Sequence, residues 1–208
     1  MNKKAATHLS KVDKTLARLI RKAGVTSPTI PRTEHPYRTL VEAVAHQQLT
    51  GKAAKTILGR VKALYPGKAF PSPKDLIATP DRKLRAAGFS RAKVASVKDI
   101  AAKTLEGIVP GHRALAKLTD TEIIERLTSI RGVGQWTVEM LLIFRLGRPD
   151  VLPATDFGVR KGYALTYRKR EMPTPKELLA YGARWAPHRS SAAWFLWRAC
   201  DLHKAAKP

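Results

Sequence analysis

Apolar residues recur along most of this chain at spacings of three and four, the period of one face of an α-helix. The first such run contains Leu9, Val12, Leu16, Leu19 and Ile20, and Ser10 is a candidate cap for this helix. No segment alternates apolar and polar residues over the length of a strand. The pattern therefore predicts an all-α protein with short loops.

Glycine, proline and capping residues divide this helical pattern into successive elements. Helices are predicted to begin at His35-Pro36, after Gly51, at Ser90, at Thr155-Asp156 and after Pro175. Two short helices are predicted around Leu76 and Leu84, and three further helices over 119–129, 135–146 and 189–203. The sequence Gln47-Gln48-Leu49-Thr50-Gly51 interrupts the pattern between two of these helices. We expect a surface turn at that point.

The composition points to a polyanionic partner. The chain has 39 Lys and Arg against 16 Asp and Glu, a formal net charge of +23. Such an excess destabilises a compact state by self-repulsion, and bound phosphates neutralise it. No basic amphipathic stripe of the kind that binds a membrane surface is present, so nucleic acid is the favoured partner. The single Cys200 excludes an internal disulfide and a four-cysteine cluster, which favours a reduced intracellular compartment.

Two kinds of membrane signal are not found in the sequence. No apolar run approaches the roughly 18 residues of a membrane helix. The basic start of the chain is not followed by the apolar stretch of about 7–15 residues that a signal peptide has. We therefore expect neither a membrane span nor a signal peptide.

The segment 127–137, LTSIRGVGQWT, has the strongest local signal in the chain. Two predicted helices flank a turn in which Gly132 and Gly134 are two residues apart, and glycine lets a ligand approach the backbone closely. The second helix starts directly after the turn, so its first N–H groups have no helical partner and attract a phosphate. Ile130 and Val133 are expected to anchor the turn in the core. In so basic a chain, this pattern favours a DNA-binding helix-hairpin-helix over an ordinary glycine-capped turn.

Four sequence blocks, one of which contains the hairpin, resemble the helix-hairpin-helix DNA glycosylase superfamily. Within that superfamily they resemble the 3-methyladenine DNA glycosylase II branch. The blocks are VEAVAHQQLTGKAAKTI, GFSRAKVASVKDIA, LTSIRGVGQWTVEMLLIF with VLPATDFGVRKGY, and WAPHRSSAAWFLWRA, within about residues 36–203. The resemblance implies a compact member without an N-terminal β domain. It implies a single catalytic unit over 1–208, with a central lobe of about 36–135 that contains the first hairpin helix, a second lobe of 1–35 plus 136–208, and an active-site cleft between the lobes.

The resemblance also implies a function. It is that of a monofunctional DNA glycosylase that excises alkylated purines, such as 3-methyladenine and 7-methylguanine, in base excision repair. Asp156 stands where the family has an essential aspartate, and a carboxylate there stabilises the positive charge that develops on the sugar. Taken alone, Asp156 is better interpreted as a helix cap. Trp136 stands where bifunctional members carry a Schiff-base lysine, so we expect no strand nicking.

The resemblance assigns further residues to substrate binding. Trp136, Trp197 and Phe157 are expected to form a base pocket, since aromatic faces attract a cationic purine. Trp185 and Trp194 are expected to lie in the core or the pocket wall. The alternative for Trp197 is that, three residues after Trp194 on one helix, it serves packing alone.

The remaining DNA contacts follow from the turn and the hairpin. Gln48 and Leu49 are both candidates for the wedge that fills the gap left by a flipped nucleotide. The alternative is an ordinary turn in which Leu49 is buried. Contacts with the DNA backbone are expected from the group Gly132, Gly134, Thr137 and Lys52.

No redox or organic cofactor is expected. The backbone carbonyls of Thr128, Ile130 and Val133 are candidate ligands for a structural Na⁺ or K⁺ at the hairpin, as in the family. The expected partner is double-stranded DNA with alkylated bases, bound by a monomer without membrane attachment, in the nucleoid of a prokaryote or the nucleus of a eukaryote.

Two alternative functions remain open. One is a glycosylase for oxidised or mismatched bases, which the absence of the Schiff-base lysine and of a cysteine cluster disfavours. The other is a non-catalytic helix-hairpin-helix module that binds DNA, which Asp156 disfavours.

Overall fold

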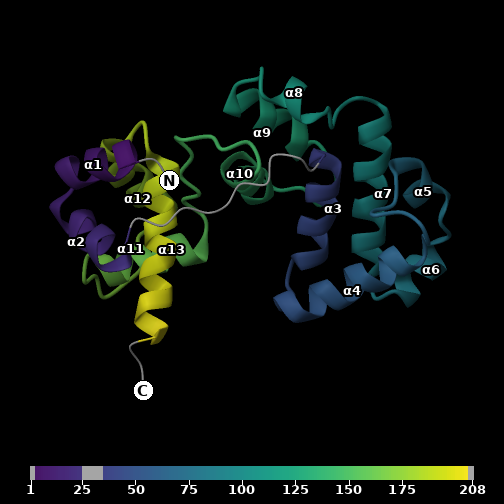
Figure 1. The fold of residues 1–208 in the computed structure, drawn as a ribbon, viewed down its shortest axis with the longest axis horizontal. Helices are drawn as coiled ribbons and strands as arrows, with labels where there is room; N and C mark the ends of the chain where they lie inside the picture. The colour runs from purple at the N-terminus through teal and green to yellow at the C-terminus, as the bar shows by residue number, and fades with distance from the viewer. Residues whose placement is uncertain (1–2, 25–34, 206–208) are drawn as a thin grey trace. The chain divides into compact units, whose positions relative to one another are not determined.

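The computed structural model describes residues 3–24 and 35–205, and all regular elements in these ranges are helical. In chain order they are α1 (Lys3–Val12), α2 (Lys14–Ala23), α3 (Pro36–His46), α4 (Gly51–Ala63), α5 (Pro73–Ala78), α6 (Asp81–Ala86), α7 (Arg91–Leu105), α8 (His112–Leu115), α9 (Asp120–Thr128), α10 (Gln135–Phe144), α11 (Phe157–Thr166), α12 (Pro175–Gly182), the 3₁₀ helix η1 (Ala183–Trp185) and α13 (Arg189–Ala205) (Figure 1). The all-α prediction is confirmed. None of these helices combines the length and the apolar character that a membrane crossing requires.

The start of the chain departs from the sequence prediction. The single helix predicted there is two helices, α1 and α2, and Ser10 lies inside α1 instead of capping a helix. The break is at Asp13, whose carboxylate accepts the backbone N–H groups of Thr15 and Leu16. Val12, predicted on the buried face, is 37% exposed. The helices α8 and η1 are also missing from the prediction, because elements of four and three residues are too short to show a period.

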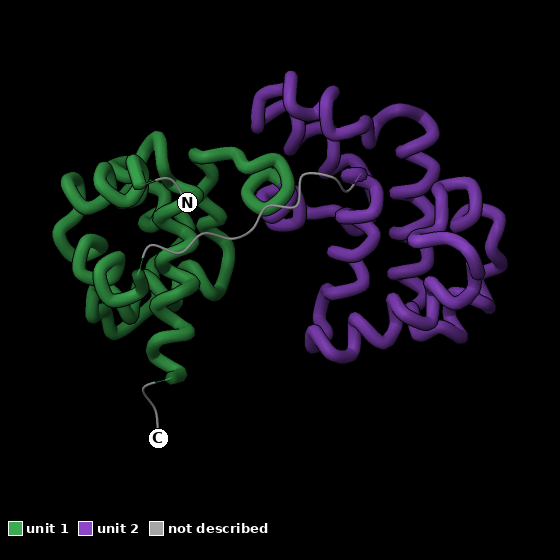
Figure 2. Tube along the Cα trace, in the orientation of Figure 1, with its two compact units in different colours: residues 1–30, 142–208 green, residues 31–141 purple. Residues whose placement is uncertain are grey.

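The chain folds into two compact units (Figure 2). Unit 1 comprises residues 1–30 and 142–208, and unit 2 comprises residues 31–141. Residues 136–141, predicted to group with the terminal segments, belong to unit 2. The pattern could not mark this boundary because it falls inside the uninterrupted helix α10. The other predicted boundary lies between residues 35 and 36. The two units divide between residues 30 and 31, which lie outside the described residues.

Unit 1 is built around α13, which packs against α11 and α2. Trp185 and Leu196 are fully buried in its core, as predicted for Trp185. The helices α11 and α13 approach so closely at Gly162 that a Cβ there would overlap the carbonyl oxygen of Leu196. Any larger residue at position 162 would therefore separate the helix that begins after Asp156 from the helix that carries Trp197.

A buried carboxylate links the N-terminal and C-terminal segments of unit 1. Asp13 is 5% exposed and accepts hydrogen bonds from the hydroxyls of Tyr167 and Tyr181 and from Nε1 of Trp185. Burial by itself raises the pKa of this carboxyl. The backbone N–H of Leu16 and the three side-chain donors together outweigh burial, and the pKa lies below its ordinary value of 3.8.

Unit 2 places α3, α5 and α6 against α7 (Figure 1). Ile130 and Val133 are 2% and 3% exposed, which confirms that they anchor the hairpin turn in the core. The side chains of Ile130 and Val133 thus fix the turn between α9 and α10 to the core, while the glycines of this turn lie at the surface of unit 2.

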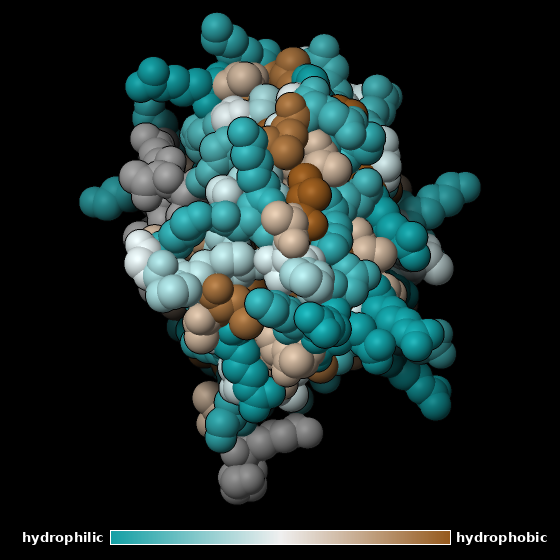
Figure 3. All heavy atoms as spheres, turned by 90° about the vertical axis from the view of Figure 1, so that its right-hand side faces the viewer, coloured by the Kyte–Doolittle hydropathy of each residue, from teal (hydrophilic) through white to brown (hydrophobic). Residues whose placement is uncertain are grey.

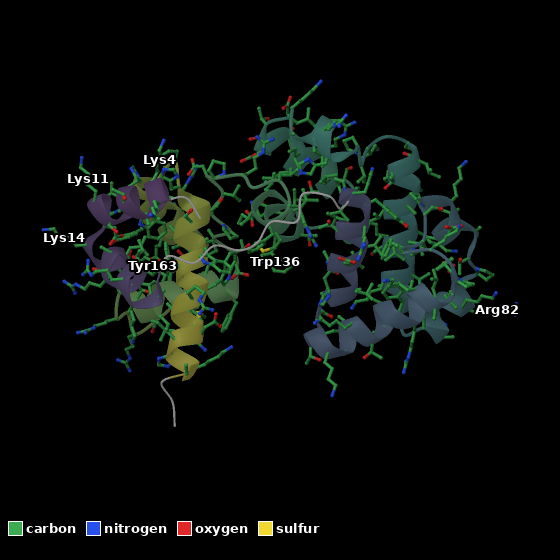
Figure 4. All side chains as sticks on the ribbon, in the orientation of Figure 1. Lys4, Lys11, Lys14, Arg82, Trp136 and Tyr163 are labelled. Carbon is green, nitrogen blue, oxygen red and sulfur yellow. The ribbon has the colours of Figure 1, made fainter. Side chains whose placement is uncertain are left out.

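The positive charge lies on the surface of both units. Lys4, Lys11 and Lys14 of α1 and α2 point outward, as does Arg82 of α6 (Figure 4). The face drawn in Figure 3 is mostly hydrophilic and carries only small, separate hydrophobic patches. The basic side chains that Figure 4 labels are thus exposed to solvent, in keeping with the charge excess of the sequence.

Candidate nucleic-acid interface and active site

The turn between α9 and α10 presents backbone donors at the surface of unit 2. Gly132 has a φ of 76°, and a Cβ there would overlap Oγ of Ser96, so only glycine fits. A Cβ at Gly134, by contrast, would meet nothing within 4 Å. In the part of the chain that the structure describes, the N–H groups of Gly132 and Gly134 donate to no backbone or side-chain acceptor. These two N–H groups lie next to the N-terminus of α10, where an anion is favoured, and that they bind a DNA phosphate stays a prediction.

The prediction that Thr137 contacts DNA is wrong for this structure. Its side chain is only 3% exposed, and its N–H donates to the carbonyl of Gly134 at 2.9 Å. The first turn of α10 directs the side chain of Thr137 into the core and uses its donor internally. Neither group is left for a phosphate.

The turn between α3 and α4 exposes both wedge candidates. Leu49 is 41% exposed, which excludes the alternative that it is buried in an ordinary turn. Gln48 is exposed and has a φ of 57°, a left-handed conformation that is uncommon for a residue with a side chain. Lys52, in the first turn of α4, is exposed as a backbone contact would need to be. That Gln48 or Leu49 enters DNA stays a prediction.

Two residues that the sequence analysis missed join this turn to its surroundings. Nε2 of Gln47 donates to the carbonyl oxygen of Gly132 in the hairpin, at 2.9 Å. Nζ of Lys93 on α7 donates to the carbonyl oxygens of Ala45 and Gln47, at 2.9 and 2.8 Å. No sequence signal could have revealed these contacts, because their acceptors are backbone carbonyls, which every residue has.

A surface cavity lies between the turn and the hairpin. It has a volume of about 590 Å³, and Gln48, Gly132 and Trp136 are among its lining residues. The side chain of Trp136 is 42% exposed (Figure 4). The wedge candidate Gln48, the hairpin and one predicted pocket aromatic are therefore brought together within unit 2.

Asp156 lies at the N-terminus of α11 in unit 1. Its Oδ1 accepts the backbone N–H of Val159 at 2.7 Å, as a helix cap does, and also accepts Nε1–H of Trp197 at 2.8 Å. The carboxyl group is half-buried, and the N-terminal end of the helix favours its negative charge. The capping role and a chemical role are thus compatible in one residue.

The segment that leads to Asp156 is held by the start of α13. Arg189 forms two hydrogen bonds of 2.8 Å with Asp150, and the guanidinium holds the pKa of Asp150 below its usual range. Oγ of Ser190 accepts the N–H of Val151 at 2.9 Å and donates to a carbonyl of the same segment. A connection without regular structure is thereby fixed before α11 begins.

The predicted pocket residues fall into two groups. Trp197 and Phe157 accompany Asp156 in unit 1, where the ring of Trp197 lies 5.5 Å from that of Phe144. Phe157 is 61% exposed, and Nζ of Lys161 lies 5.7 Å from its ring centroid. Trp136 belongs to unit 2, so its place in a common pocket stays a prediction. For Trp197, the hydrogen bond to Asp156 adds a function that the sequence does not predict.

Residues 41–188 match the HhH-GPD superfamily of base excision DNA repair proteins. The chain belongs to this superfamily. The matched segment includes the exposed turn after α3, the glycine hairpin and Asp156, and it ends before Trp197.

Individual members of the HhH-GPD superfamily are similar over nearly the whole chain. DNA-3-methyladenine glycosylase 1 of Schizosaccharomyces pombe is 41% identical over 206 residues, which are 99% of this chain and 90% of that protein. The solved structure of the S. pombe 3-methyladenine DNA glycosylase Mag1 in complex with abasic DNA has a TM-score of 0.90 at 41% identity, covering 98% of this chain and 100% of that one. A DNA-3-methyladenine glycosidase from Bacillus halodurans has a TM-score of 0.85 at 35% identity, covering 97% and 91%.

Proposed function

We propose that this protein is a monofunctional DNA-3-methyladenine glycosylase, which flips alkylated purines out of double-stranded DNA and hydrolyses their N-glycosidic bond. The observation that carries the proposal is Asp156, oriented by two donors at the start of α11. This chain belongs to a superfamily of base excision DNA repair proteins, and its sequence is 41% identical to a 3-methyladenine DNA glycosylase.

The chemistry requires a fixed negative group beside the sugar. In 3-methyladenine and 7-methylguanine the purine ring is positively charged, so the bond between C1′ and the base nitrogen is already weakened. As this bond breaks, the electron pair leaves with the base and positive charge develops on the sugar. The carboxylate of Asp156 stabilises that charge, orients the water whose oxygen bonds to C1′ and accepts the proton that this water loses. Trp197 holds the carboxylate in place through its indole N–H.

The remaining residues bind and open the DNA. Gly132 and Gly134 hold a phosphate through their N–H groups, and Gln48 or Leu49 fills the gap left by the flipped nucleotide. The aromatic faces of Trp136, Trp197 and Phe157 receive the cationic base. Lys52 contacts the backbone beside the wedge.

A monovalent cation completes the hairpin in this proposal. Its ligands are the backbone carbonyl oxygens of Thr128, Ile130 and Val133. Among the described residues, the carbonyls of Thr128 and Val133 accept no backbone hydrogen bond, while that of Ile130 accepts the N–H of Val133. Neutral oxygen donors of this kind suit Na⁺ or K⁺, and the bound ion would stiffen the turn.

The protein leaves an abasic site and does not cut the strand, because Trp136 stands where a lysine nucleophile would be needed. It acts as a monomer on genomic DNA, in the nucleoid or the nucleus. No organic cofactor takes part in this reaction.

The test is the release of free bases from methylated genomic DNA, identified by chromatography. We expect 3-methyladenine and 7-methylguanine from the wild-type protein. Duplex binding without base release would instead support a non-catalytic module, and release of oxidised or mismatched bases alone would support a different specificity. Borohydride added during the reaction should trap no covalent complex. A trapped adduct would contradict the monofunctional assignment.

A further inference from the structure

One face of α7 contacts both of the loops that are proposed to bind DNA. Lys93, Ser96 and Asp99 follow one another at intervals of three residues, so they lie along one side of the helix. Lys93 donates to one carbonyl in the last turn of α3 and to one directly after that helix, and Ser96 lies against Gly132. Asp99 accepts the backbone N–H of Arg131 at 2.7 Å. All three contacts are within unit 2.

The contact of Lys93 is suited to fixing the turn. The last carbonyls of α3 lack helical partners, and a cation at a helix C-terminus interacts favourably with them. Nζ of Lys93 reaches the carbonyls of both Ala45 and Gln47, one before and one after the last residue of the helix. The next residue, Gln48, has a φ of 57°, a left-handed conformation that is unfavourable for a residue with a Cβ. The two bonds therefore hold the backbone directly before a strained and exposed residue.

A second contact sets the turn against the hairpin. The side chain of Gln47 donates to the carbonyl of Gly132, whose own N–H faces a phosphate in the proposed function. With Lys93 on one side and Gly132 on the other, the turn has little freedom to move relative to the hairpin.

We propose that Lys93 is a positioning residue, which holds the turn 47–50 against the hairpin so that the wedge enters DNA at a fixed distance from the bound phosphate. This inference rests on the proposed function of the turn and the hairpin. Extruding a nucleotide requires breaking its base pair and its stacking, and a wedge already held in place spends none of its binding energy on being ordered.

The decisive variant is Lys93→Met, which keeps an unbranched side chain only one atom shorter and removes its donors. Lys103→Met is the matched control, because Lys103 lies on the same helix, carries the same charge and pairs with the exposed Glu106. Lys93→Arg restores a cationic donor. Each protein is assayed on a duplex with 7-methylguanine opposite cytosine, and on the same duplex with 7-methylguanine opposite an abasic-site analogue.

The second duplex has no base pair to break, so it depends less on the wedge. We expect Lys93→Met to lose roughly 10- to 100-fold in single-turnover rate on the paired lesion, which corresponds to a few kcal/mol of extrusion. On the unpaired lesion we expect a loss of at most about threefold, and Lys93→Arg should recover most of the rate. Affinity for undamaged duplex should equal that of Lys103→Met. Because the two lesions are compared within one protein, a general loss of stability cannot produce this difference.

A readout that needs no base release separates this inference from the proposed function. 2-Aminopurine beside an abasic-site analogue becomes more fluorescent when a wedge unstacks it. We expect the increase on binding the wild-type protein and the Lys103→Met variant, and a much smaller one with Lys93→Met. If the wild-type protein releases no base, the proposed function fails while this measurement still tests the position of the wedge. Equal losses on paired and unpaired lesions, or an unchanged fluorescence increase with Lys93→Met, would overturn the inference.

Discussion

The indole N–H of Trp197 donates to Oδ1 of Asp156 at 2.8 Å, the same oxygen that accepts the N–H of Val159. The carboxylate is thus oriented both by its own helix, α11, and by α13. A tryptophan for which the sequence predicts base stacking, or packing alone, also holds the proposed catalytic group. The two functions of its side chain can be separated by substitution.

Trp197→Phe keeps an aromatic face and removes the donor. We expect base release to fall about tenfold, because a hydrogen bond to a charged group contributes about 1.5–3 kcal/mol and part of it is recovered from water. The loss should be similar for cationic 7-methylguanine and neutral hypoxanthine. Trp197→Leu should cost cationic lesions a further factor of about 2 to 30, through the lost cation–π contact. Single-turnover rates on both lesions measure this, and a loss in Trp197→Phe confined to cationic bases would show that stacking alone matters.

Asp156→Asn should separate chemistry from helix capping. Asparagine caps a helix as well as aspartate does, so thermal stability should change by less than about 1 kcal/mol. Base release should fall 100-fold or more, because the charge that stabilises the sugar cation is gone. Asp156→Ala should in addition lose about 0.5–2 kcal/mol of stability with the cap. If Asp156→Asn keeps more than about a tenth of the wild-type rate, Asp156 is a cap and not the catalytic group.

Gly134→Ala and Gly132→Ala should behave differently. A Cβ at Gly134 meets nothing within 4 Å, so this variant should fold normally but bind damaged and undamaged duplex several-fold more weakly. Gly132 has a φ of 76° and no room for a Cβ beside Ser96, so Gly132→Ala should also lose stability, by at least about 1–2 kcal/mol. Chemical denaturation and duplex binding measure the two effects. Undiminished binding by Gly134→Ala would place the DNA backbone elsewhere.

The two wedge candidates can be distinguished on the same pair of substrates as Lys93. Gln48→Gly relieves the left-handed conformation and should leave stability unchanged or raised by up to about 1 kcal/mol. Leu49→Ala removes an exposed side chain and should also be close to neutral for stability. The variant that slows release of a paired lesion and spares an unpaired one identifies the wedge. If neither variant does so, the turn has no wedge.

Asp13→Asn should destabilise unit 1 in a pH-dependent way. The pKa of Asp13 is lower in the folded state than its ordinary value of 3.8, so the carboxylate contributes stability above about pH 4 and loses that contribution as the pH falls through its folded-state pKa. At pH 7 we expect the variant to lose about 2–4 kcal/mol, because a charged acceptor of several buried hydrogen bonds is replaced. Urea denaturation from pH 7 to pH 2.5 should show the gap between the two proteins narrowing below pH 4. A gap that stays constant would mean that the charge of Asp13 is not what stabilises this cluster.

The sequence by itself determined most helices and the hairpin, because helical period, caps and glycine turns are local properties. The segment 119–129 is one example: Thr119 and Glu122 form a capping box, and Ile123 and Leu127 are buried on one face. The start of α11 at Asp156 and the anchoring of the hairpin by Ile130 and Val133 also follow from neighbouring residues. Helices, helix caps and glycine turns could therefore be predicted from the sequence.

Only the tertiary structure decided how these pieces hold one another. The carboxylate of Asp13 accepts hydrogen bonds from donors more than 150 residues away in the chain, and the bond from Trp197 to Asp156 spans 41 residues. Thr137 turns inward because of the packing of α10, against the sequence prediction. Lys93 and Gln47 act on backbone carbonyls, which look the same at every position of a sequence. Such contacts form only when distant segments pack together, so no local pattern of residue types encodes them.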